Sequence, residues 1–366
     1  MRFIKIFFLL AVAASFFGSL NAQDKDDEVL RVDTQIVDVP VIVTDKDGKP
    51  ILNLRQSNFI VYEDGKRQEI ADFSATAAPF EVAILLDTSG STRQDLSLIK
   101  RAAENFIASL RTGDRVSIIS FKSEVINNRW ETSSEILSNL TDDRNKLKAA
   151  LENVKTTNGT PYYDSLLQII EKVFGEKPAA GFRGRRAFVA LTDGVDSTSA
   201  SDFDEVREIT AASGVVSYFV QINTRESFES NLLGDCQSST HFSVAQINRY
   251  YRTFYPNSDV EKVLEFCKLG DFERLDISRR LYQLAEREMQ ELAKTSGGKV
   301  FPVTDLSGAR VAFKKVADEI GTKYSLGYYS SNEKRDGTLR KIKIELTGVP
   351  AGALVRAREG YTAPTN

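Results

Sequence analysis

A carboxylate and two hydroxyls stand together where an apolar segment of the chain ends. Residues 83–86 are an apolar run of strand length, Asp87 follows it directly, and Ser89 and Ser91 come at the next alternate positions. In open α/β sheets, ligands bind beyond the carboxyl ends of the strands. Oxygen ligands without His or Cys suit Mg²⁺, Mn²⁺ or Ca²⁺, and a small octahedral site favours Mg²⁺. We therefore expect these three side chains to bind a hard divalent cation.

Two further segments are expected to bring oxygens to the same edge of a sheet. Thr160 follows a glycine and precedes a proline at a predicted helix start, and taken alone it is at least as well explained as a plain helix cap. Asp193 ends another apolar run and precedes a glycine, which by itself is ordinary turn chemistry. Asp164 and Asp196 lie nearby in sequence, and we expect both to be solvated surface charges.

The middle of the chain alternates between strand-like and helix-like segments. Apolar runs predict strands at 80–86, 115–121, 187–191, 215–222 and 300–303, and a short antiparallel edge strand at 127–132. Amphipathic periodicity predicts helices at 95–111, 144–154, 161–174, 203–213, 278–294 and 306–322. Such alternation predicts an α/β fold, a doubly wound and mostly parallel sheet with helices on both faces.

Both ends of the chain are strand-like. Residues 37–44 alternate with a period of two, and 59–62 and 70–73 read as further strands; 324–329, 341–346 and 353–357 do the same near the other end. We expect the two flanks to build one small β-sandwich-like domain, in which the segment 324–366 packs with 29–75. Two separate flanking hairpins are the alternative. Pro40 predicts that its strand lies at a sheet edge.

One connection does not fit this alternation. Residues 225–277 are too long for a simple link between a strand and a helix. They hold both cysteines, the single histidine and a cluster of aromatic residues, which favours an ordered subdomain. In an exported protein, a disulfide between Cys236 and Cys267 is favoured over free thiols. A zinc site using His241 with the two cysteines has only three apparent ligands.

The first residues read as a secretory signal peptide. Arg2 and Lys5 precede an apolar stretch at 6–17, and small residues end at Ala22. A retained anchor is the alternative, although the stretch falls short of the ~20 residues that a span needs. Removal of 1–22 takes the net charge of the 366-residue chain from −3 to −5, which disfavours nucleic acid as a partner. We expect a secreted or periplasmic protein.

Taken together, the three oxygen-bearing segments resemble the von Willebrand factor type A domain. The resemblance spans about residues 80–322, and the metal-ion-dependent adhesion site of that family implies five metal-site residues here, namely Asp87, Ser89, Ser91, Thr160 and Asp193. The stretches Tyr-Ser-Leu-Gly-Tyr-Tyr at 324–329 and Arg-Ala-Arg-Glu-Gly-Tyr at 356–361 resemble exported bacterial proteins of the related kind found in Acidobacteria. The expected division is a signal peptide at 1–22, a β segment at 23–78, the type A domain at 79–323 with the insertion 225–277, and a β segment at 324–366.

The resemblance implies a binding module, with no catalytic residues and no organic cofactor. The family implies that the hydroxyls can ligate the ion directly while one or both aspartates act through water, so the cation remains electrophilic. The implied partner is a protein that offers an Asp or Glu carboxylate. A scaffold with a purely structural metal is the alternative. An aspartic-type hydrolase is remote, because residues 86–90 resemble one Asp-Thr-Gly/Ser loop and that chemistry needs two; the lone histidine makes a serine hydrolase equally weak.

Overall fold

The structure is a computed structural model that describes residues 36–75, 79–176, 185–232, 241–257, 262–321 and 324–365. The predicted signal peptide and Cys236 lie outside these residues. Within the described ranges, no helix is both long enough and apolar enough to cross a membrane.

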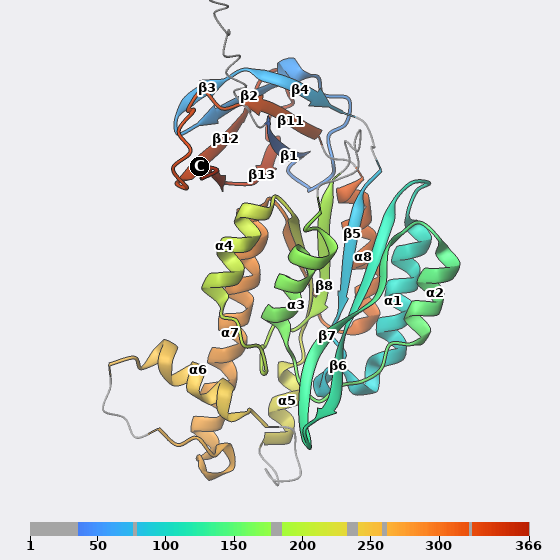
Figure 1. The fold of residues 1–366 in the computed structure, drawn as a ribbon, viewed down its shortest axis with the longest axis vertical. Helices are drawn as coiled ribbons and strands as arrows, with labels where there is room; N and C mark the ends of the chain where they lie inside the picture. Colours follow the sequence, from blue (N-terminus) through green and yellow to red (C-terminus); the bar gives the residue numbers. More distant parts are fainter. Residues whose placement is uncertain are drawn as a thin grey trace, which may run out of the picture. The chain divides into compact units, whose positions relative to one another are not determined.

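A six-stranded sheet forms the centre of the α/β part (Figure 1). Its strand order is β10-β9-β8-β5-β6-β7, and every neighbouring pair is parallel except β6 and β7, which are antiparallel. The predicted mostly parallel α/β sheet is thereby confirmed. The strands are β5 (Glu81–Leu86), β6 (Arg115–Ile126), β7 (Arg129–Thr141), β8 (Arg186–Thr192), β9 (Val216–Ile222) and β10 (Lys299–Val303).

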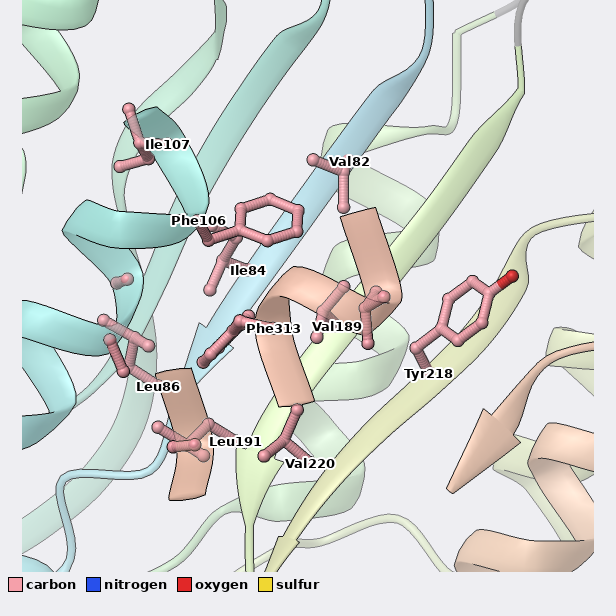
Figure 2. Packing of buried hydrophobic residues seen from close by; sticks show 14 of the residues in the cluster. Val82, Ile84, Leu86, Phe106, Ile107, Val189, Leu191, Tyr218, Val220 and Phe313 are labelled. Carbon is pink, nitrogen blue, oxygen red and sulfur yellow. The ribbon is translucent and has the colours of Figure 1, made fainter. Parts of the chain in front are cut away.

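Apolar side chains on the two faces of this sheet form separate clusters, because successive residues of a strand point to opposite faces. On one face, Ile84 packs with Phe106 and Phe313, whose ring centroids lie 5.4 Å apart (Figure 2). On the other face, Leu85 belongs to a cluster that includes Phe188. The first face is covered by α1 (Leu96–Ser109), α2 (Arg144–Glu152) and α8 (Leu306–Ile320), and the second by α3 (Tyr162–Gln168), α4 (Phe203–Ser213) and α7 (Asp271–Ser296).

Several boundaries differ from the predicted ones for local reasons. The predicted edge strand at 127–132 is instead a 13-residue strand, because Asn127 and Asn128 adopt positive φ and make a tight turn that lets β7 pair along β6. A 3₁₀ turn, Gly90–Asp95, precedes α1, and a π turn, Ile169–Val173, follows α3. Helix α7 begins at Asp271 rather than at 278.

The flanks form two four-stranded antiparallel sheets, with the orders β13-β1-β11-β4 and β14-β12-β2-β3. Each sheet contains strands from both ends of the chain, so the flanks fold together rather than as separate hairpins. A shared apolar cluster that includes Val39, Val61 and Leu326 fills the space between them. The strands are β1 (Ile36–Thr44), β2 (Phe59–Glu63), β3 (Lys66–Gln68), β4 (Ile70–Ser74), β11 (Tyr324–Tyr329), β12 (Leu339–Leu346), β13 (Leu354–Ala357) and β14 (Gly360–Thr362).

The prediction that Pro40 marks an edge strand is wrong. Strand β1 lies between β11 and β13. Pro40 is opposite Ser325 of β11, whereas β13 pairs with β1 only from Val41 onward. An interior strand tolerates this proline because β13 requires no hydrogen bond at its position.

The long insertion contains short helices around an apolar core of its own. Strand β9 ends at Ile222, and α5 (Arg225–Leu232) follows promptly; α6 (Val244–Phe254) and a 3₁₀ turn (Phe266–Lys268) come next. We call these three elements, together with α7 as far as Ala285, the helical subdomain. Its buried residues include Leu232, Phe242, Ile247, Tyr251, Phe266 and Leu281. The described part of the insertion is therefore ordered, as expected.

Candidate metal centre

The Asp87 carboxylate joins the carboxyl ends of the two central strands. Asp87 follows β5 directly and is fully buried. Its Oδ1 accepts a hydrogen bond of 3.0 Å from the Ser89 amide, and its Oδ2 accepts one of 2.7 Å from the Thr192 hydroxyl at the end of β8. Burial raises the pKa of Asp87, and the hydrogen bonds from Ser89 and Thr192 oppose that rise. A buried carboxylate of this kind is stabilised by a nearby cation.

Ser89 lies with Asp87 in one tight loop. Ser89 is buried and immediately precedes the 3₁₀ turn Gly90–Asp95. The Thr92 hydroxyl holds the loop by donating to the carbonyl oxygens of Asp87, at 3.0 Å, and of Ser89, at 3.1 Å. The side chain of Ser91 is outside the described part of the structure, so its predicted role stays a prediction.

Thr160 lies in a second loop, which is hydrogen-bonded to the loop of Asp87 and to the loop that follows Asp193. The Thr157 amide donates to the Thr88 carbonyl at 2.8 Å, beside Asp87. The Thr160 amide donates to the Ser197 hydroxyl at 2.8 Å, and the Ser197 amide donates back to the Thr160 carbonyl at 3.0 Å. These bonds connect the loop of Thr160 to the loops that carry the two predicted aspartates.

The start of α3 shows what Thr160 does not do. Helix α3 begins at Tyr162, and the residue at its N-cap, Pro161, supplies no side-chain cap. The Tyr162 amide instead donates to Asp196 Oδ1 at 2.9 Å. Asp196, rather than Thr160, thus caps this helix, which weakens the plain-cap explanation of Thr160.

Asp193 follows β8 in the third loop and is 5% exposed. Its Oδ1 accepts a hydrogen bond of 3.0 Å from the Val195 amide, and its Oδ2 accepts one of 2.6 Å from the Thr224 hydroxyl. Thr224 and its neighbour Tyr282, whose hydroxyls lie 2.9 Å apart, are not among the predicted site residues. Their distance in sequence from Asp193 gives no local pattern that would reveal them.

The expectation of a solvated charge is wrong for Asp196, whereas Asp164 is half-buried. Burial raises the pKa of Asp196 to about 6, although hydrogen bonds from Ser199 and from the Tyr162 and Tyr163 amides oppose the rise. Asp164 accepts hydrogen bonds of 2.9 Å from the amides of Ala200 and Ser201. Both carboxylates fasten the 196–201 segment to the start of α3, so they shape the rim of the candidate site.

The donor set fits a hard cation. Among the described residues, no group of three or more His, Cys, Asp or Glu side chains could hold a metal, and the predicted ligands include the hydroxyls of Ser89 and Thr160. Tyr162 OH is buried and has no hydrogen-bond partner in the described part of the chain. Its pKa is raised by burial and by the carboxylates of Glu288, Asp196 and Asp87.

His241 and Cys267 belong to the helical subdomain. The His241 ring stacks near Phe266, with centroids 6.4 Å apart. Because Cys236 lies outside the described residues, the predicted disulfide to Cys267 and the zinc alternative stay untested.

Residues 82–195 match the family model described as von Willebrand factor type A domain. The match begins in β5, ends just after β8, and includes all five predicted metal-site positions. The chain thus contains a domain of this type. No curated protein matches the chain significantly.

Several solved structures are distantly similar. The conserved hypothetical protein BatB from Bacteroides thetaiotaomicron is 18% identical, with TM-score 0.41 and coverage of 66% of this chain and 98% of that chain. A von Willebrand factor type A structure from Catenulispora acidiphila is 11% identical, with TM-score 0.42 and coverage of 90% and 75%. The pilus adhesin SpaC from Lactobacillus rhamnosus GG is 9% identical, with TM-score 0.41 and coverage of 88% and 47%. These likenesses are too distant to support a statement about function.

Proposed function

We propose that this protein is an exported, non-enzymatic binding module that uses a divalent cation, Mg²⁺ by preference, to capture an acidic group of a partner protein. The supporting observation is the convergence of three loops at the carboxyl edge of β5 and β8. Their cross-linking hydrogen bonds, Thr192 to Asp87, Thr157 to Thr88 and Thr160 to Ser197, hold these three loops against one another, which supports a shared binding site. The residues assigned to the ion are Asp87, Ser89, Ser91, Thr160 and Asp193.

The chemistry of this donor set explains the choice of partner. The described hydrogen bonds already occupy both oxygens of Asp87 and both oxygens of Asp193. Two carboxylates engaged in this way neutralise a cation less than direct ligation by both would. A bound Mg²⁺ supplies Lewis acidity toward an anionic oxygen. An Asp or Glu side chain of another protein, at a surface outside the cytoplasm, meets that requirement.

Calorimetric titration with Mg²⁺ tests the metal part of the proposal. The wild type is expected to bind Mg²⁺, and Asp87→Ala is expected to lose that binding. Equal binding by the two proteins would show that the ion is held elsewhere.

Capture of exported proteins on the immobilised wild type tests the partner part. Capture is expected in Mg²⁺, and it should disappear with a chelator or in Asp87→Ala. Capture that is insensitive to both would favour the second candidate, a scaffold whose metal only ties loops together; the buried, hydrogen-bonded state of Asp87 is the observation that supports that candidate.

A further inference from the structure

The carboxylate of Asp193 is linked to the helical subdomain by two consecutive hydrogen bonds. The Thr224 hydroxyl lies 2.6 Å from Asp193 Oδ2 and 2.9 Å from Tyr282 OH. Thr224 directly precedes α5, and Tyr282 lies on α7 within the helical subdomain. Two elements that the type A match does not include therefore reach one of the predicted metal-site carboxylates.

The backbone that follows Asp193 is embedded in the same subdomain. Val195 is buried as a member of the subdomain's apolar cluster, among residues such as Leu232, Ile247 and Phe266. Gly194 adopts φ +76°, and a Cβ added there would lie 3.0 Å from Met289 Cε of α7. The turn at 193–195 is therefore packed against side chains of the subdomain and of α7.

A second link joins the subdomain to the loop of Thr160. Arg249 of α6 forms a buried ion pair with Glu288 of α7, at 2.6 and 2.7 Å to its two carboxylate oxygens. Tyr163, near the start of α3, donates to Glu288 at 2.6 Å, and the Arg249 guanidinium lies 5.0 Å from the Tyr163 ring centroid. Helix α6 is thus linked, through Glu288 and Tyr163, to the segment that follows Thr160.

We infer that the helical subdomain positions Asp193 for the cation through Thr224, Tyr282 and Val195, so that metal binding and docking of the subdomain are thermodynamically coupled. This inference rests on the proposed function and adds a regulatory element to the same site. Groups that orient a metal-binding side chain typically change metal affinity about 10–100-fold when they are removed. Coupling is reciprocal, so an ion that binds better to the docked state also stabilises docking.

Four variants separate a positioning role from a general structural one. Thr224→Val removes the hydroxyl between Asp193 and Tyr282 while keeping the shape of the side chain, and Thr224→Ser restores the hydroxyl. Tyr282→Phe removes the outer hydroxyl. Tyr250→Phe is the matched control, because Tyr250 lies in the same subdomain but donates to Asp276 at 2.9 Å instead of to Thr224.

The first readout is calorimetry with Mg²⁺ alone, after thermal unfolding in EDTA has established that each variant folds. Thr224→Val is expected to bind at least about tenfold more weakly than the wild type. Tyr282→Phe should show a smaller loss, while Thr224→Ser and Tyr250→Phe should stay close to the wild type. The inference is overturned if Thr224→Val or, should that variant not fold, Tyr282→Phe binds as the wild type does.

The second readout is amide hydrogen exchange with and without Mg²⁺. In the wild type, Mg²⁺ should slow exchange in α6 and at residues 193–196, and Thr224→Val should abolish the effect in α6. Unchanged exchange in α6 when the wild type is saturated with Mg²⁺ contradicts the coupling but leaves the metal site intact. A wild type that binds no Mg²⁺ overturns the proposed function and this inference together.

Discussion

Replacing Asp196 by asparagine should remove a specific part of the pH dependence of stability. Burial raises the pKa of Asp196 from 3.8 to about 6 in the folded protein. Between these two values the folded state binds more protons than the unfolded state, so the free energy of unfolding falls as pH rises from about 4 to about 6 and is level above that. This difference in the pKa of Asp196 corresponds to at most about 3 kcal/mol of the free energy of unfolding. That contribution is lost once the pH is high enough for the carboxylate to be ionised in both the folded and the unfolded state.

The substitution is close to isosteric at this site. The asparagine side chain would keep an oxygen to accept from the Tyr162 amide, which donates at 2.9 Å, and it would carry no charge at any pH. Urea unfolding of both proteins, in EDTA and at several pH values from about 4 to about 7.5, gives the difference in stability as a function of pH. The other carboxylates are common to both proteins, so most of their contributions cancel.

The expected result is a difference in favour of Asp196→Asn that grows from near zero at about pH 4 to as much as about 3 kcal/mol at about pH 7. If the free energies of unfolding of the two proteins depend on pH in the same way, the prediction is wrong, because the Asp196 carboxylate then titrates alike in the folded and unfolded chains.

Three further predictions concern other parts of the molecule. Asp87→Asn should abolish the stabilisation by Mg²⁺, which for the wild type amounts to about 2.7 kcal/mol at a Mg²⁺ concentration about 100 times the Kd. Thermal unfolding with and without Mg²⁺ measures this effect, and an equal shift of the Tm in both proteins would contradict the assignment of Asp87 to the metal site. Gly194→Ala should lower stability by about 1–2 kcal/mol or more, because residue 194 has positive φ and its side chain would press on Met289; unchanged urea unfolding would speak against this turn geometry. Glu63→Ala should lower the free energy of unfolding by about 3 kcal/mol, because the buried carboxylate accepts hydrogen bonds from Tyr328 at 2.8 Å, from Tyr361 at 2.9 Å and from Ser330. Limited proteolysis of the flanks tests this prediction, and resistance equal to that of the wild type would contradict it.

The central sheet is predictable from sequence because its inner strands β5, β8 and β9 are largely buried on both faces. After Glu81, the residues of β5 are all apolar and buried, and this apolar run ends sharply at Asp87. The helix that periodicity predicts at 203–213 has the observed bounds of α4, Phe203–Ser213, where Asp202 caps the first turn and Gly214 ends the helix in the left-handed region.

The errors share a different cause, since they depend on contacts between distant parts of the chain. Pro40 is tolerated in an interior strand because β13 is short and does not pair with β1 at that position. How far β13 extends depends on strand pairing and cannot be read from the local sequence. Strands β3 and β14 have three residues each, too few for a periodic pattern to appear. The sequence around Asp196 predicts a surface charge, because the contact of Asp196 with the start of α3 depends on the fold and not on local sequence.

The candidate site likewise contains residues that the sequence predicts and residues that only the structure reveals. Its strand-end residues, such as Asp87 and Asp193, follow apolar runs and are visible in the sequence. Thr224 and Tyr282 are not, because Thr224 lies 31 residues from Asp193 and 58 from Tyr282. Only the fold of the helical subdomain brings them together.

Diffraction from crystals grown with Mn²⁺ in place of Mg²⁺ shows where the cation binds, because Mn²⁺ scatters anomalously. We expect one strong anomalous peak at the carboxyl edge of β5 and β8, within coordination distance of the hydroxyls of Ser89 and Thr160. The same peak should be absent in Asp87→Ala. Full Mn²⁺ occupancy at another place, with none at this edge, would contradict the account.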